Sequence, residues 1–112
     1  MTFATFDVVV VPFPYSDRLA EKRRPALVVS APILGRDLSR IWVAMITSDR
    51  GLRLHGDAEI LDLTGAGLPV SSVLRASKVA TIEADRVLRR AGALSEADRT
   101  GAIAALKACA GF

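Results

Sequence analysis

The sequence contains one cysteine (Cys109), one histidine (His55) and no long apolar run. A single cysteine cannot form a disulfide within the chain, and a reducing compartment suits it better than an oxidising one. No Cys/His spacing supports a metal site, and we expect no cofactor. Apolar runs such as DVVVVPFPY end far short of the roughly 20 residues of a membrane span. The start, MTFATFD, has no basic stretch followed by an apolar block, so we expect a cytoplasmic protein without a secretion signal.

Lysine is also scarce, because twelve of the fifteen basic residues are arginine, and the net charge is +3. A planar guanidinium binds phosphate and carboxylate through two parallel hydrogen bonds, whereas lysine acts as a point charge. The composition therefore favours nucleic acid or an acidic protein segment as partner, without choosing between them.

The stretch EKRRPALVVS sets Lys22, Arg23 and Arg24 directly before Pro25 and an apolar run. Three adjacent like charges repel one another, so their arrangement has a local free-energy cost. The run is therefore either a solvated turn or a seat for an anion.

The length of 112 residues and the absence of repeats and linkers predict one domain, residues 1–112. Short apolar or alternating runs bounded by turn signals predict strands, and a Ser95–Asp98 capping box predicts a terminal helix with Ile103, Leu106 and Ala110 on one face. The expected strands cover 7–13, 25–30, 40–48, 58–63, 71–77 and 87–94, with a possible helical turn in 31–39. This pattern predicts a mainly β fold, a small antiparallel barrel or strongly bent sheet closed by one C-terminal helix.

Five blocks in order, DVVVVPFPYSD, KRRPALVVS, VAMITS, SSVLRASKVATI and VLRRAGALS, resemble the MazF/PemK family of type II toxin–antitoxin endoribonucleases. The resemblance runs from about residue 6 to the C-terminal helix. It implies an SH3-like barrel of the MazF/PemK/CcdB type and a homodimer. It also implies metal-independent, sequence-specific cleavage of single-stranded RNA, and an antitoxin whose tail blocks the RNA site.

The resemblance also implies site residues. The family's arginine before the proline falls on Arg24, the threonine ending the long strand on Thr47, and a second arginine on Arg75. Two positions depart from the pattern: Ser77 replaces the acidic residue of PemK-like members, and Phe6 replaces the usual glycine before the first strand.

These residue types suit attack of the RNA 2′-hydroxyl on the adjacent phosphate. Arg24 can present several N–H donors to the charge that develops on the phosphate, and Thr47 can bind a phosphate oxygen or orient the nucleophile. Alternatively, Thr47 makes ordinary strand-end hydrogen bonds, and Arg75 forms an ion pair with a nearby carboxylate.

The proton acceptor stays unresolved at this stage. His55 is the usual type of acid–base residue, but no family residue maps to it, and a lone loop histidine is mostly solvated surface. Glu21 lies in the loop before Arg24, where it can equally be a solvated partner of the neighbouring cations.

Single-stranded RNA is held by stacking and by a basic groove. With only one Trp, one Tyr and four Phe, most aromatic residues must pack the core, and we expect Phe13 and Trp42 to do so. The candidate RNA-binding residues are Tyr15, Lys22, Arg23, Ser48, Ser77 and Lys78.

Two other functions are compatible with the same fold. The gyrase inhibitor CcdB shares it and poisons a protein complex, and a barrel with a decayed site would bind RNA without cutting it. The "RRP" and "ITS" blocks favour the nuclease. A basic groove would also accept an acidic, partly disordered antitoxin tail that folds on binding.

Overall fold

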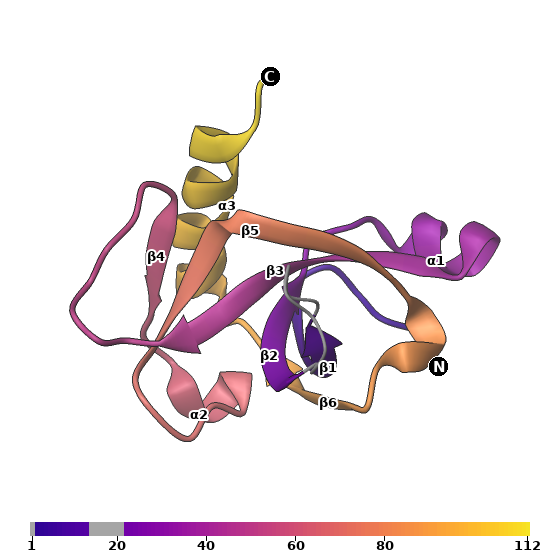
Figure 1. The fold of residues 1–112 in the computed structure, drawn as a ribbon, viewed down its shortest axis with the longest axis horizontal. Helices are drawn as coiled ribbons and strands as arrows, with labels where there is room; N and C mark the ends of the chain where they lie inside the picture. The colour runs from indigo at the N-terminus through magenta and orange to yellow at the C-terminus, as the bar shows by residue number, and fades with distance from the viewer. Residues whose placement is uncertain (1, 14–21) are drawn as a thin grey trace.

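Six strands form one antiparallel sheet in the order β4-β5-β3-β2-β1-β6 (Figure 1). This arrangement is seen in a computed structural model that describes residues 2–13 and 22–112. The strands are β1 (Asp7–Phe13), β2 (Lys22–Val28), β3 (Arg40–Ser48), β4 (Asp57–Ile60), β5 (Ser72–Glu83) and β6 (Arg89–Ala93). Together with the C-terminal helix, they confirm the expected mainly β fold.

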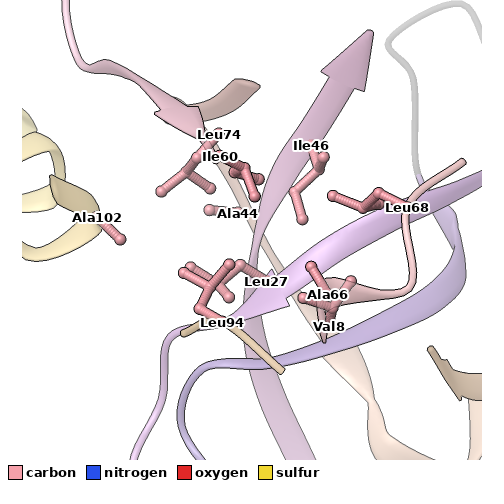
Figure 2. Packing of buried hydrophobic residues seen from close by; sticks show 10 residues of the cluster. All are labelled: Val8, Leu27, Ala44, Ile46, Ile60, Ala66, Leu68, Leu74, Leu94 and Ala102. Carbon is pink, nitrogen blue, oxygen red and sulfur yellow. The ribbon is translucent and has the colours of Figure 1, made fainter. Parts of the chain in front are cut away.

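The continuous apolar runs of the central strands are explained by burial on both faces of the sheet. Successive side chains of a strand point to opposite faces, so Val8 and Val9 enter different clusters. One cluster contains Phe3, Val9, Val11, Ala26, Val28, Ile41, Val43, Met45 and Ile82. The other contains Val8, Leu27, Ala44, Ile46, Ile60, Ala66, Leu68, Leu74, Leu94 and Ala102, of which Ala102 comes from the C-terminal helix (Figure 2).

The helices are short except for the last. They are α1 (Pro32–Leu38), α2 (Leu63–Ala66) and α3 (Glu96–Cys109), with a 3₁₀ turn at Ala84–Arg86. The predicted cap of α3 is confirmed, because the Ser95 hydroxyl accepts a hydrogen bond from the Asp98 N–H at 3.1 Å. None of the helices in the described ranges is long and apolar enough to cross a membrane.

The predicted apolar face of α3 is right only at Leu106, which is partly buried against the core. The helix, which packs against β4 and β5, buries Asp98, Ala102 and Ala105, while Ile103 and Ala110 are exposed. The reason is Asp98, whose carboxylate accepts hydrogen bonds from the backbone N–H groups of Leu61 and Asp62. A buried carboxylate satisfied in this way turns the small alanines toward the sheet.

Three other expectations need correction. β2 begins at Lys22, so the basic run lies within a strand and not in the loop. Most of the segment 78–86, which was expected to separate two strands, belongs to β5 (Ser72–Glu83), and only residues 84–88 separate β5 from β6. Trp42 does not fill the core, since 51% of its surface is exposed. The side chain of Phe13 lies outside the described part of the structure.

The position where the resemblance expects glycine has a backbone that suits glycine. Phe6 adopts φ +74°, which costs a non-glycine residue about 1–2 kcal/mol. Its N–H donates to Val28 O, and its carbonyl accepts from the Leu94 N–H. The ring is partly buried, with the Arg99 guanidinium 5.5 Å from its centre. These contacts hold the strained residue at the entry to β1.

Candidate functional site

The candidate site lies where the ladder between β2 and β3 ends. Its last pair is Ala26 with Met45. The Val29 N–H donates to Trp42 O of β3. Backbone N–H groups alternate in direction along a strand, so positions 27 and 25 also face β3. Pro25 stands at one of these positions and has no N–H to donate. The ladder therefore stops there, and Arg24 follows just beyond it.

Arg24 and Thr47 lie on the same face of the sheet, each two residues beyond the last pair of the β2–β3 ladder. The residue numbers of the paired positions in β2 and β3 keep one register, and its continuation takes Arg24 to Thr47. Both residues are half-buried, whereas Lys22 and Arg23 are exposed. Alternation places Arg23 on the opposite face from Arg24. The two residues that the family pattern singles out thus lie on one face, just beyond the same end of the ladder.

The cross-strand pairing continues from Thr47 through β5 to β4. Thr47 pairs with Val73 of β5, and Val73 pairs with Glu59 of β4. Directly opposed residues share a face, so Glu59, Val73 and Thr47 form one row across three strands. Arg24 lies on the same face, beyond the end of the β2–β3 ladder. We refer to the three paired residues as the site row.

Arg75 is two residues from Val73 on β5, on the same face as the site row, and it forms an ion pair with a carboxylate. Its Nε and Nη2 donate to Asp57 Oδ1 and Oδ2 at 3.1 and 3.0 Å. The Asp57 side chain is 1% exposed and also accepts from the Leu54 N–H at 2.9 Å. The ion pair named above as the alternative for Arg75 is therefore present. The hydrogen bonds from Arg75 hold the pKa of Asp57 below its usual value, and those to Asp57 raise the pKa of Arg75.

The remaining predicted residues are more dispersed. Ser48 faces away from Thr47 by strand alternation, and its hydroxyl accepts from Arg50 Nε at 3.4 Å. Ser77 and Lys78 are exposed in a bulge of β5, because Met45 pairs with Arg75 while Ala44 pairs with Val79. Tyr15 and Glu21 lie outside the described residues.

His55 belongs to a different part of the molecule. Its Nε2 lies 3.4 Å from Ala108 O at the end of α3, and its ring is exposed. Within the described part of the chain, no three His, Cys, Asp or Glu side chains are grouped to hold a metal ion.

A cavity of about 360 Å³ lies toward the other end of β3. It contains none of the predicted site residues. Its walls are formed by Phe3, Gly35, Ser39, Arg40, Glu83, Ala84, Asp85 and Val87.

The sequence reasoning missed Asp57 and Glu59. Both alternate with the inward-facing Ala58 and Ile60 in the segment DAEI, which is the signal of a strand with one acidic face. That alternation could have placed the two carboxylates on one side of a strand. It could not have shown that this side also carries Arg75 and Thr47.

Comparisons with known proteins agree with this fold. A MazF from Deinococcus radiodurans superposes with a TM-score of 0.80 at 18% identity, covering 100% of this chain and 99% of that one. An endoribonuclease from a mycobacterial species, solved with its cognate antitoxin, gives 0.77 at 16%, covering 96% and 93%. The Mycobacterium tuberculosis toxin MazF-mt6 gives 0.70 at 22%, covering 89% and 91%.

No curated protein matches this sequence. Residues 4–109 match the family described as PemK-like, MazF-like toxin of type II toxin–antitoxin system. Since the match spans nearly the whole chain, this protein belongs to the PemK-like, MazF-like toxins of type II toxin–antitoxin systems.

Proposed function

We propose that this toxin is a metal-independent endoribonuclease that cuts single-stranded RNA at specific sequences in the cytoplasm. The observation that supports the proposal is that Arg24 and Thr47 share one face of the sheet, each two residues beyond the last pair of the β2–β3 ladder. Family membership and structural relatives described as endoribonucleases support it.

The chemistry needs no bound cofactor, because RNA carries its own nucleophile. The 2′-hydroxyl attacks the adjacent phosphorus and forms a 2′,3′-cyclic phosphate, and the 5′-oxygen of the next nucleotide leaves. Extra negative charge develops on the phosphate oxygens in the transition state. Arg24 stabilises that charge through its guanidinium donors, and the Thr47 hydroxyl binds a phosphate oxygen beside it.

Arg75 serves as a second fixed cation near the phosphate. Asp57 takes up two of the guanidinium's five N–H donors and fixes the plane of the group. The pair is nearly neutral as a whole, so Arg75 contributes less to transition-state stabilisation than Arg24 does.

RNA outside the scissile phosphate contacts the exposed cations on both sides of the site. Lys22 and Arg23 extend β2 beyond Arg24, and Ser77 with Lys78 lies in the β5 bulge beyond Arg75. Tyr15 supplies a stacking surface for a base. Ser48 is the weakest of the proposed contacts, because it faces away from Thr47.

We further infer that the toxin forms a homodimer and binds an antitoxin. Trp42 and Val79 are exposed neighbours on β3 and β5, which is unusual for side chains of this size and supports an interface between two copies. An acidic, partly disordered antitoxin tail suits the same basic residues that bind RNA. Antitoxin added to the cleavage assay below should therefore inhibit it.

The deciding experiment incubates the purified protein with a long mixed-sequence single-stranded RNA in excess EDTA. Arg24→Ala is tested beside it, with Arg36→Ala as a matched control. Arg36 is an exposed arginine of α1. We expect discrete cuts with 5′-hydroxyl and cyclic phosphate ends from the wild type and the control. Loss of one electrostatic contact to the transition state predicts a fall of about 10²–10³-fold in Arg24→Ala.

Each other outcome points to a different function. Cleavage by folded Arg24→Ala at the wild-type rate contradicts the proposal. RNA that is bound but stays intact across diverse sequences indicates the inactive RNA-binding barrel. Neither binding nor cleavage indicates a toxin that inhibits a protein target, and inhibition of DNA gyrase is then the next assay.

A further inference from the structure

The cavity near the start of β3 is lined partly by apolar and partly by charged side chains. Phe3, Ala84 and Val87 supply apolar surface, and all three belong to or pack against one of the two apolar clusters of the sheet. The volume of about 360 Å³ falls within the range of about 300–1,000 Å³ that small-molecule sites occupy. None of the described residues proposed to act on RNA lines this cavity, so a ligand bound there would not touch them.

The backbone around the cavity is held by hydrogen bonds between separate elements. Ser39 ends α1 with φ +54°, a left-handed conformation that is unfavourable for a residue with a Cβ atom. Its N–H donates to Gly35 O at 3.0 Å, and its carbonyl accepts from the Ala84 N–H at 2.9 Å. These bonds join the end of α1 to the 3₁₀ turn, and both segments line the cavity. A cavity fixed in this way needs little rearrangement to bind a ligand.

Three exposed charged side chains of the cavity do not neutralise one another. Arg40 and Glu83 are directly opposed in the pairing of β3 with β5. Among the residues that the structure describes, however, Glu83 and Asp85 have no partner for a side-chain hydrogen bond or an ion pair. Arg40 Nη1 donates to Leu38 O at 3.5 Å, which leaves most of the five guanidinium donors available. The cavity therefore offers one cation and two carboxylates beside an apolar surface.

We propose that this cavity binds a free α-amino acid with a large apolar side chain. The carboxylate of the ligand accepts two parallel hydrogen bonds from Arg40, and its ammonium group donates to Glu83 and Asp85. Its side chain leaves water and lies against the apolar lining. Other ligands match fewer of these groups. A polyamine provides no anion for Arg40, and a phosphate places negative charge beside two carboxylates.

The proposal is tested first with ligands, by isothermal titration calorimetry of the full chain. Among L-phenylalanine, L-leucine and L-tryptophan, at least one should bind at one site per chain with a Kd of about 1 mM or lower. Three related probes each lack one feature. N-acetyl-L-phenylalanine has no ammonium group, 2-phenylethylamine has no carboxylate, and L-alanine has no large side chain. Each should bind at least about tenfold more weakly, because a hydrogen bond between charged groups or the burial of a large apolar side chain contributes at least that factor.

The site is then tested with Arg40→Gln and Glu83→Gln, each of which removes one charge and keeps a polar side chain. The matched controls are Arg36→Gln in α1 and Glu96→Gln in α3, two exposed residues that do not line the cavity. Affinity for the amino acid that binds best should fall at least about tenfold in the first two variants. It should stay within about twofold of the wild type in the controls, because exposed charges away from the ligand contribute little.

Three results would overturn the amino acid site. The first is that none of the three apolar amino acids binds at concentrations up to about 10 mM. The second is that 2-phenylethylamine or N-acetyl-L-phenylalanine binds as tightly as the amino acid, which would mean that one of the two charges is not recognised. The third is that Arg40→Gln and Glu83→Gln bind the ligand like the controls. Calorimetry with amino acids involves no RNA, so failure of the proposed nuclease function would leave this site unaffected.

Discussion

Asp57 shows how one residue can link the stability of the fold to the geometry of the site. Its side chain is 1% exposed, and its two oxygens accept hydrogen bonds from Arg75 and Leu54. Removing one partner of a buried pair leaves an uncompensated charge, which costs several kcal/mol even where the pair itself adds little. Asp57 thereby ties Arg75 to the loop between β3 and β4.

Asp57→Asn should lower the free energy of unfolding by about 3 kcal/mol at pH 7. The hydrogen bonds from Arg75 lower the pKa of Asp57 in the folded state, so its stabilising effect is fully present above the unfolded pKa of about 3.9. That effect is lost as the pH falls through the folded pKa. The stability difference between wild type and variant should therefore shrink in acid, as measured by urea unfolding between pH 7 and pH 2.

Asp37→Asn is the control for this comparison, since Asp37 faces Arg36 at 3.7 Å in an exposed pair. Exposed pairs contribute about 0–1 kcal/mol, so this variant should unfold like the wild type. An Asp57→Asn effect that does not change between pH 7 and pH 2 would show that shape, and not charge, makes the residue important.

At the residue scale, a candidate site residue can be chosen from the sequence where one short block indicates both its residue type and its position in a strand. Arg24 before Pro25 and Thr47 at the end of β3 could be chosen before the structure was known, and both lie on one face just beyond the β2–β3 ladder. Their role in cleavage stays a prediction. Glu59 could not be chosen, because its place in the row depends on pairings across β5.

At the scale of elements, strand β5 shows why such pairings are hard to predict. Its residues Ala76, Ser77 and Lys78 form a bulge that shifts the register against β3. From the sequence, Ser77 and Lys78 resemble the end of a strand, and the strand was therefore expected to end at residue 77 and not at Glu83. A one-residue error in register moves a side chain to the other face, so partners across a bulge cannot be read from alternation alone.

The short helix α2 offers a test of how closely elements pack around the sheet. Gly67 ends α2 at φ +71°, and a Cβ atom there would lie 2.7 Å from the Ala91 carbonyl carbon of β6. Gly67→Ala should therefore lose the backbone preference of glycine, about 1 kcal/mol, and also push α2 off β6. We expect a total loss of about 3 kcal/mol in urea unfolding.

Gly51→Ala is a closely matched control for this substitution. Gly51 has φ +84°, but nothing lies within 4 Å of the added Cβ atom. The control should lose only the backbone term of about 1 kcal/mol. If both variants lose equal stability, the close approach of α2 to β6 contributes nothing measurable.

At the scale of the whole molecule, the exposed indole of Trp42 argues for a second copy of the chain. Trp42 was expected in the core, because aromatic residues are scarce and large. The structure leaves 51% of it exposed, and its diagonal neighbour Val79 is 57% exposed. A second protomer that covers these side chains would explain why they lie on the sheet surface.

A homodimer formed through Trp42 makes a quantitative prediction, because a two-fold interface uses the residue twice. Covering the exposed half of an indole, roughly 100 Å², contributes about 2.5 kcal/mol per protomer and about 5 kcal/mol per dimer. Trp42→Glu should therefore weaken dimerisation by at least about 1,000-fold, as measured by sedimentation equilibrium.

Leu61→Glu, at an exposed apolar position after β4, should leave the equilibrium unchanged. A wild type that is monomeric at micromolar concentration would contradict the homodimer, and a dimeric Trp42→Glu would move the interface away from β3, because a glutamate cannot be buried there without a partner for its charge.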